Sequence, residues 1–251
     1  MSLLTDKVVL LTGASKGIGA ATADKLLKDG AIVIGTYNSG IGALKELGDI
    51  YGAGRLLALK GDLGDAAAVE TIWQQALGFK GRIDALVNNA GTMAEVGVDS
   101  SDTDWHLAWQ QTMAVNVQAV ADLCRKAIVH FKGRDGGAIV SIASRAAQRG
   151  DSIDYMHYAA SKGAVVALMK SIARGYAGDN ILAYTIAPGW VKTDMAAIAY
   201  EPGNEHMFAE IPMGTAAPPE EIGNLIAFLL SDQARHTTGS TFDINGASYV
   251  R

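Results

Sequence analysis

The chain contains a single cysteine, Cys124, among its 251 residues. One cysteine cannot form an internal disulfide, which is typical of proteins from a reducing compartment. The net charge is −5 without a run of basic residues, whereas binding to nucleic acid or to anionic membranes requires a basic face. No apolar run approaches the ~18 residues of a transmembrane helix, and no signal-peptide pattern is present. We therefore expect a cytoplasmic protein that binds neither nucleic acid nor membranes.

Metal ligands and domain boundaries are also scarce in this sequence. The 5 histidines are scattered without the spacing of metal ligands, so we expect no metal site. No linker, low-complexity segment or internal repeat divides the chain. Hydrophobic residues make up 49% and charged residues 19%, which favours a folded chain with a large core. We expect residues 1–251 to form one domain.

Short apolar segments alternate with segments of helical periodicity. The expected strands are 8–12, 31–36, 55–60, 83–88, 137–143, 181–187 and 240–244. The expected helices are 17–28, a short helix ending near 52, 65–77, 104–131, 155–176 and 219–230. Strands that are apolar throughout are buried on both faces, as in a parallel sheet. The alternation predicts a doubly wound α/β fold, with about seven parallel strands and helices on both faces.

The longest segment without a clear pattern is 188–218. A long loop in a compact domain is usually functional, and this segment contains Met195, Tyr200, Met207 and Phe208. We predict a lid over a partly hydrophobic substrate pocket; the alternative is that these side chains only pack the loop against the core. Other residues that could face substrate are Met93, Glu95, Gln148, Asp154, Tyr155 and Trp190.

Three glycines, Gly13, Gly17 and Gly19, lie between the first expected strand and the first expected helix. Gly13 would permit a tight turn, and the other two would let the backbone approach a pyrophosphate. A helix N-terminus offers free N–H groups and the positive end of the helix dipole. The spacing is Gly-x3-Gly-x-Gly, not the more widespread Gly-x-Gly-x-x-Gly. The segment predicts binding of a dinucleotide.

The end of the second expected strand bears on the choice of cofactor. It carries no Asp or Glu, the residues that usually bind a free ribose 2′-hydroxyl. Lys16 lies inside the glycine loop, where its ammonium would attract a 2′-phosphate. We therefore predict NADP(H), with NAD(H) as the alternative if Lys16 is simply solvated. After the third strand, Asp62 and Leu63 could meet an adenine ring, although Asp62 could equally cap the next helix.

Tyr158 and Lys162 lie four residues apart, on one face of an expected helix. A nearby ammonium favours the phenolate and lowers the phenol pKa from ~10. Such a phenol could exchange a proton at neutral pH. The alternative is an ordinary surface tyrosine beside a solvated lysine.

These motifs together resemble the short-chain dehydrogenase/reductase family over essentially the whole chain. The residues that carry the resemblance are Thr12, Gly13, Ala14, Ser15, Lys16, Gly17, Ile18, Gly19, Asp62, Asn88, Asn89, Ala90, Gly91, Asn116, Ser144, Tyr158, Lys162, Pro188 and Gly189. Within the family, the chain is most similar to 3-oxoacyl-carrier-protein reductases and their broad-specificity relatives. The resemblance implies a Rossmann fold and a homotetramer or homodimer.

The resemblance also implies a role for each catalytic residue. Tyr158 would be the general acid in reduction, and Lys162 would lower its pKa and hold the nicotinamide ribose. Ser144 would hydrogen-bond the substrate oxygen, and Asn116 would position a water that extends the proton relay. The expected cofactor-binding residues are Gly13, Ser15, Lys16, Gly17, Ile18, Gly19, Asn38, Asp62, Leu63, Asn89, Ala90, Gly91, Tyr158, Lys162, Pro188, Gly189, Val191 and Thr193.

Two segments depart from the family pattern. Thirteen residues separate Ser144 from Tyr158, where the family more often has twelve, so the loop on the substrate side should differ. Ala247 follows Asn245-Gly246, where the family usually has a second glycine.

The function implied is an NADP(H)-dependent carbonyl reductase or alcohol dehydrogenase that acts on a small molecule, with 3-oxoacyl thioesters as candidate substrates. An NAD-dependent sugar or polyol dehydrogenase is the alternative enzyme. A nucleotide-sensing binding protein on the same fold is the alternative without catalysis.

Overall fold

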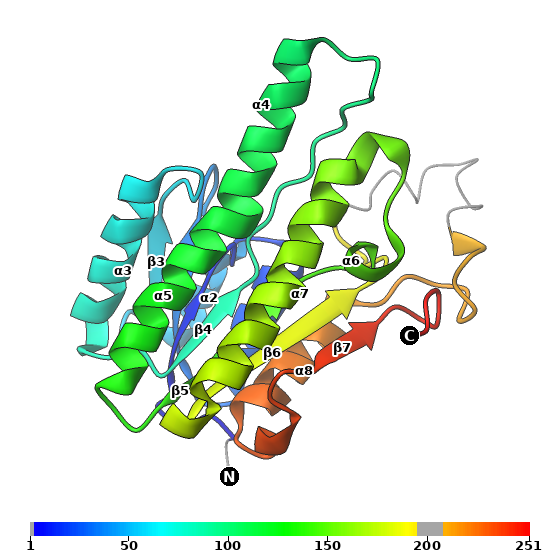
Figure 1. The fold of residues 1–251 in the computed structure, drawn as a ribbon. Helices are drawn as coiled ribbons and strands as arrows, with labels where there is room; N and C mark the ends of the chain where they lie inside the picture. Colours follow the sequence, from blue (N-terminus) through cyan, green and yellow to red (C-terminus); the bar gives the residue numbers. More distant parts are fainter. Residues whose placement is uncertain (1–2, 195–207) are drawn as a thin grey trace.

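The computed structural model describes residues 3–194 and 208–251. Seven parallel strands form one sheet in the order β3-β2-β1-β4-β5-β6-β7 (Figure 1). The strands are β1 Val8–Leu11, β2 Ile32–Tyr37, β3 Leu56–Lys60, β4 Ala85–Asn88, β5 Gly137–Ile142, β6 Ile181–Pro188 and β7 Thr241–Ile244. The predicted doubly wound fold with a parallel sheet is confirmed, and each predicted strand is found within one or two residues at either end.

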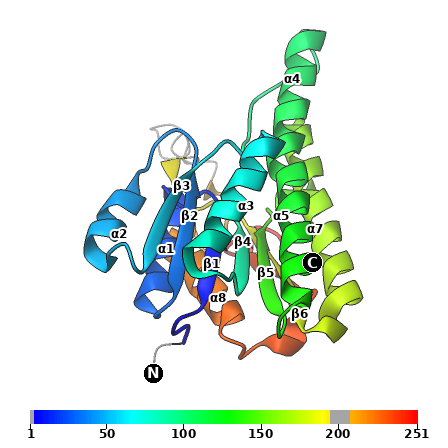
Figure 2. The same cartoon turned by 90° about the vertical axis from the view of Figure 1, so that its left-hand side faces the viewer.

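Helices cover both faces of the sheet (Figure 2). One face carries α1 Gly17–Lys28, α2 Ala43–Tyr51 and α8 Pro219–Leu230, and the other carries α3 Ala66–Lys80, α5 Ala119–Lys132 and α7 Met156–Tyr176. Successive side chains of a strand point to opposite faces. In β1, Val9 and Leu11 join the first core while Val8 and Leu10 join the second. The all-apolar strands thus supply both hydrophobic layers.

The predicted long helix 104–131 is instead three consecutive elements. It begins with α4 Asp102–Met113, continues as a π-helical turn η1 Ala114–Gln118 and ends with α5. Ser101 caps α4, because its Oγ accepts a hydrogen bond from Asp104 N and donates one to Asp104 Oδ2. A π-helical turn inside an α-helix often marks a functional site, and this one carries Asn116.

The described part of the chain also contains the short helices α6 Ala146–Arg149, η2 Ile153–Tyr155, η3 Ala177–Asp179 and η6 Arg235–Thr237. Cys124 is buried in the second core, where burial raises its thiol pKa to about 12. Within residues 3–194 and 208–251, no helix is long and apolar enough to cross a membrane.

Candidate active site

A cleft of about 1320 Å³ opens along the carboxyl ends of the strands. The strand order reverses between β1 and β4, which is where such sheets bind ligands. Every residue predicted to bind cofactor lines this cleft, and so does Ser144. The fold therefore gathers the predicted residues of several distant segments around one space.

The glycine loop has a tight turn at Gly13 and close protein contacts at Gly17 and Gly19. Gly13 has a φ of 67°, a left-handed conformation that favours glycine. A Cβ atom at Gly19 would lie only 1.9 Å from the Gly13 carbonyl oxygen, and one at Gly17 would lie 3.1 Å from Thr193 Cγ2. The N-terminus of α1 thus faces the cleft without side chains over it. This cradle and the free N–H groups of the first turn suit a pyrophosphate.

Thr12 connects this loop to the segment after β4. Its hydroxyl accepts hydrogen bonds from the backbone N–H groups of Asn89 and Ala90, both at 3.0 Å. The Asn89 side chain donates in return to the carbonyl oxygens of Thr12 and Gly13, again at 3.0 Å. The two loops are therefore held as one unit, which explains why both motifs occur together.

The end of the cleft that would hold adenosine carries the residues weighed for cofactor choice. Lys16 and Asn38 are exposed and line it, together with Tyr37 and Ser39. Asp62 Oδ1 accepts a hydrogen bond from Gly64 N, whereas the cap of α3 is Asp65, whose Oδ1 accepts from Ala67 N. Asp62 is therefore not the cap of α3, which was the alternative role that the sequence allowed for it.

Ser144, Tyr158 and Lys162 meet at the cleft beyond the end of β5. Lys162 is 5% exposed, and its Nζ donates to the Ile142 carbonyl oxygen at 3.0 Å while lying 5.6 Å from the centroid of the Tyr158 ring. Ser144 Oγ accepts a hydrogen bond from Ala146 N. The three polar side chains come from the strand end and from one face of α7.

The expected lowering of the Tyr158 pKa is not found. Burial raises the pKa of Tyr158 to about 12; the hydrogen bond with Ser144 lowers it, and the charge of Asp151 raises it further. Burial also lowers the pKa of Lys162 to about 8. The prediction was wrong because it considered only the charge of Lys162, whereas desolvation disfavours the charged form of each group.

Asn116 holds a neighbouring loop. Its side chain accepts a hydrogen bond from Thr92 N at 2.8 Å and donates to Thr92 O and to Ser161 Oγ. Asn116 is 1% exposed and does not line the cleft, so its side chain is occupied by protein partners. Asn116 Oδ1 still lies near Lys162. A Cβ atom built on Gly91 would be 3.4 Å from Asn116 Oδ1 and 3.4 Å from Lys162 Nζ.

The substrate side of the cleft contains some of the residues that the sequence suggested, together with polar residues that were not predicted. Met93, Tyr155 and Trp190 line it, whereas Glu95, Gln148 and Asp154 do not. Glu95 instead accepts a hydrogen bond from the Tyr155 hydroxyl at 3.2 Å. Other residues that line the cleft were not predicted from the sequence, among them Gln110, Gln111, Arg145, Arg149, Asp151 and Ser152. Only the unusual length of the Ser144–Tyr158 segment hinted at the last four.

Residues 195–207 of the predicted lid lie outside the described part of the chain. Met195, Tyr200 and Met207 lie outside the described residues, and of the four apolar side chains only Phe208 is described. The described ends of segment 188–218 meet, because Val191 pairs with Ala217 in an isolated bridge.

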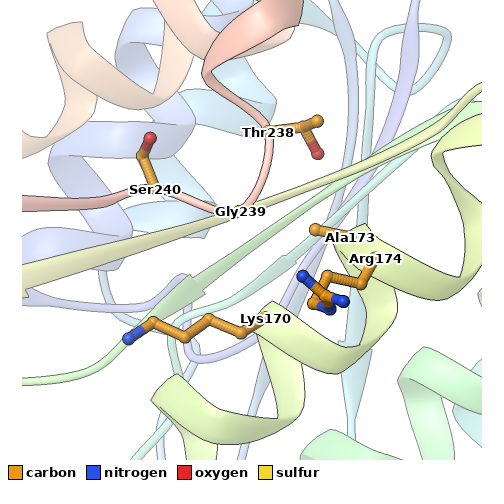
Figure 3. A pocket seen from close by; sticks show the side chains of 6 residues that line it. All are labelled: Lys170, Ala173, Arg174, Thr238, Gly239 and Ser240. Carbon is orange, nitrogen blue, oxygen red and sulfur yellow. The ribbon is translucent and has the colours of Figure 1, made fainter.

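A second hollow, of about 300 Å³, lies at the other end of α7 (Figure 3). It is lined by Lys170, Arg174, Thr238 and Ser240 with Ala173 and Gly239. At 1.5 Å of rise per residue, Lys170 lies about 12 Å along the helix from Lys162. This hollow is therefore separate from the catalytic residues.

Comparison with known proteins identifies the class. Residues 13–247 match a family model described as enoyl-(acyl carrier protein) reductase. The 3-oxoacyl-[acyl-carrier-protein] reductases of Salmonella typhimurium and of Escherichia coli are each 34% identical over 246 residues, covering 97% of this chain and 98% of theirs. The chain belongs to the short-chain dehydrogenase/reductase family of oxidoreductases.

One further relative is named for a different reaction, and a solved structure shares the fold. A 3alpha-hydroxysteroid dehydrogenase of Mediterraneibacter gnavus is 33% identical over 249 residues, covering 98% of both chains. A short-chain dehydrogenase/reductase of Serratia marcescens has 32% identity and a TM-score of 0.90, covering 98% of this chain and 99% of that one. The family is thus shown, while its relatives act on different compounds.

Proposed function

We propose that this protein is an NADP(H)-dependent oxidoreductase that interconverts a carbonyl compound and a secondary alcohol. The observation that carries the proposal is the meeting of Ser144, Tyr158 and Lys162 in the same cleft as the glycine loop. A cofactor bound along that cleft would supply the hydride, and the chain would supply orientation and the proton.

Tyr158 acts as the proton donor in reduction. With a pKa of about 12, its phenol is protonated at neutral pH and can donate to the substrate oxygen as negative charge develops there. The Ser144 hydroxyl hydrogen-bonds with Tyr158 and would donate to the same substrate oxygen. The ammonium of Lys162 would stabilise the phenolate that remains, as an opposite charge nearby does. In alcohol oxidation the same proton moves in reverse.

The decisive experiment removes only the phenol oxygen. Tyr158→Phe should abolish turnover while NADPH still binds, because the ring keeps its packing but has no proton to give. Tyr176→Phe is the matched control, since it removes a hydroxyl from the far end of the same helix, outside the cleft, and should retain turnover. Wild-type turnover in Tyr158→Phe would refute the proposed role. Binding of NADPH without turnover of any substrate by the wild type would favour the nucleotide-sensing alternative.

The preference for NADP(H) rests on charge at the adenosine end of the cleft. Lys16 is exposed there, and it forms no ion pair with the residues that the structure describes. Its ammonium is therefore available to a 2′-phosphate. Lys16→Glu should weaken NADPH binding much more than NADH binding, measured by fluorescence titration. An equal loss for both cofactors would favour the NAD-dependent alternative.

Two reaction types are suggested by the comparisons. The family model's description names an enoyl reductase and the similar proteins of Salmonella and Escherichia are 3-oxoacyl reductases. Two hydroxyls beside one reacting oxygen suit reduction of a carbonyl, so 3-oxoacyl thioesters are our first candidate substrates.

NADPH oxidation should be followed with acetoacetyl and crotonyl thioesters, keto sugars and ketosteroids. Faster turnover of the crotonyl thioester would contradict the carbonyl assignment, and a preference for keto sugars with NADH would favour the sugar or polyol dehydrogenase.

A further inference from the structure

Two arginines and a glutamate form a charged cluster on the substrate side of the cleft. The Arg145 guanidinium donates hydrogen bonds to Glu210 and to Ser248 Oγ, the latter at 2.5 Å. Arg149 Nη1 donates to Glu210 Oε2 at 2.8 Å. Glu210 therefore bridges both arginines, and Arg145 joins three segments that are far apart in sequence.

The three charges differ in their exposure. The Arg145 side chain is 7% exposed, whereas those of Arg149 and Glu210 are 33% and 37% exposed. A buried guanidinium requires a partner, because an uncompensated charge away from water is costly. Burial lowers the Arg145 pKa and the hydrogen bond with Glu210 opposes this change. Arg145 thus depends on Glu210, while Arg149 can turn toward water.

The Arg145 backbone lies in the loop 143–149, which follows β5 and carries Ser144. Its N–H donates to the Pro188 carbonyl oxygen at 2.9 Å, and its carbonyl oxygen accepts from Arg149 N at 3.1 Å. Its neighbour is Ser144, whose hydroxyl accepts from Ala146 N at 3.1 Å. Movement of Arg145 would therefore move the Ser144 hydroxyl and would release the loop from the end of β6.

We propose that Glu210 is a positioning residue for the proposed reaction: by neutralising Arg145 it fixes the loop that places Ser144 beside Tyr158. The inference rests on the proposed function for its catalytic consequence, but the placement of the loop can be measured without turnover. It also assigns a use to the Ser144–Tyr158 segment, whose length departs from the family pattern.

Kinetics with the full-length enzyme provide the first test. Glu210→Gln removes the charge but keeps the shape, and Glu220→Gln in the exposed first turn of α8 is the matched control. Because a displacement of about 1 Å in an active site can cost on the order of 100-fold, we expect Glu210→Gln to lower kcat by roughly 10- to 100-fold. The Kd for NADPH should stay unchanged, and Glu210→Asp should recover part of the rate.

Hydrogen–deuterium exchange provides the second test. The amides of residues 146–149 should exchange faster in Glu210→Gln than in wild type or Glu220→Gln, because their hydrogen bonds depend on Ser144 and Arg145. Unchanged exchange and kcat would overturn the inference. Loss of NADPH binding together with kcat would also overturn it, since the residue would then support the fold in general. If the wild type reduces nothing, the proposed function fails, and the exchange experiment alone decides whether Glu210 places the loop.

Discussion

Replacing Gly19 with alanine should disrupt the nucleotide loop through a single methyl group. The added Cβ would lie 1.9 Å from the Gly13 carbonyl oxygen and 2.6 Å from Asn89 Nδ2. Non-bonded heavy atoms need roughly 3.5 Å, so the start of α1 would have to move by roughly 1.5 Å. The Gly13 oxygen belongs to the backbone and cannot rotate away.

The cost combines strain with lost hydrogen bonds. Overpacking of this kind costs about 1–3 kcal/mol, and displacing the Asn89 amide weakens two hydrogen bonds worth about 1 kcal/mol each. We expect a loss of about 3 kcal/mol, which lowers Tm by about 6–12 °C in a chain of this size. NADPH affinity should fall in parallel, because the displaced helix start is the proposed pyrophosphate site.

Gly78→Ala is the matched control for this experiment. Gly78 lies inside α3, and a Cβ there would meet nothing within 4 Å. Alanine in a helix interior is favoured over glycine by about 0.5–1 kcal/mol, so this variant should melt slightly higher than wild type. Differential scanning calorimetry and NADPH titration of both variants check the prediction. A Gly19→Ala protein with unchanged Tm and Kd would refute the close-contact argument.

Three further outcomes are expected. Because burial lowers the Lys162 pKa from 10.5 to about 8, the unfolded state binds more protons between those values, and the stability contributed by Lys162 rises with pH by about 3 kcal/mol across them. In urea unfolding, the free energy of unfolding of wild type should therefore rise relative to that of Lys162→Met between pH 8 and 10. A difference between the two proteins that stays constant with pH would contradict this. Asn116→Ala removes the hydrogen bonds to Thr92 and should lower stability by about 2 kcal/mol together with kcat, measured by thermal melting and initial rates; an unchanged protein would show that these bonds are dispensable. Sedimentation analysis should give a homotetramer or homodimer, and a monomer would contradict the family expectation.

Much of the fold was predictable because its signals are local. Helices α1 and α8 begin and end at the predicted residues, since a glycine loop or a proline marks each start. The strands were predictable because both faces of the sheet are buried, so neighbouring residues such as Val8 and Val9 are both apolar. The π-helical turn at Asn116 was not, because it accompanies side-chain bonds to Thr92, 24 residues away. Periodicity alone continues the helix through that point.

The sequence predicted which residues meet in the site, but it did not predict their pKa values or hydrogen bonds. Spacing places Tyr158 and Lys162 on one face of a helix, yet it does not reveal the burial that sets both pKa values. Nor does it reveal that Lys162 donates to Ile142 O. The link between Arg145 and Glu210 spans 65 residues, so no local pattern could indicate it.

Several residues that border the cleft donate hydrogen bonds to carbonyl oxygens at the strand ends, and the parallel sheet explains why. Strand ends leave carbonyl oxygens without a ladder partner, and buried carbonyls require donors. Here Asn89 donates to Thr12 O just beyond β1, Lys162 donates to Ile142 O at the end of β5, and the Arg145 N–H donates to Pro188 O at the end of β6. Residues that border the cleft thus also satisfy the backbone of the sheet. A substitution that removes the Asn89 or Lys162 side-chain donor should therefore change stability and catalytic geometry together.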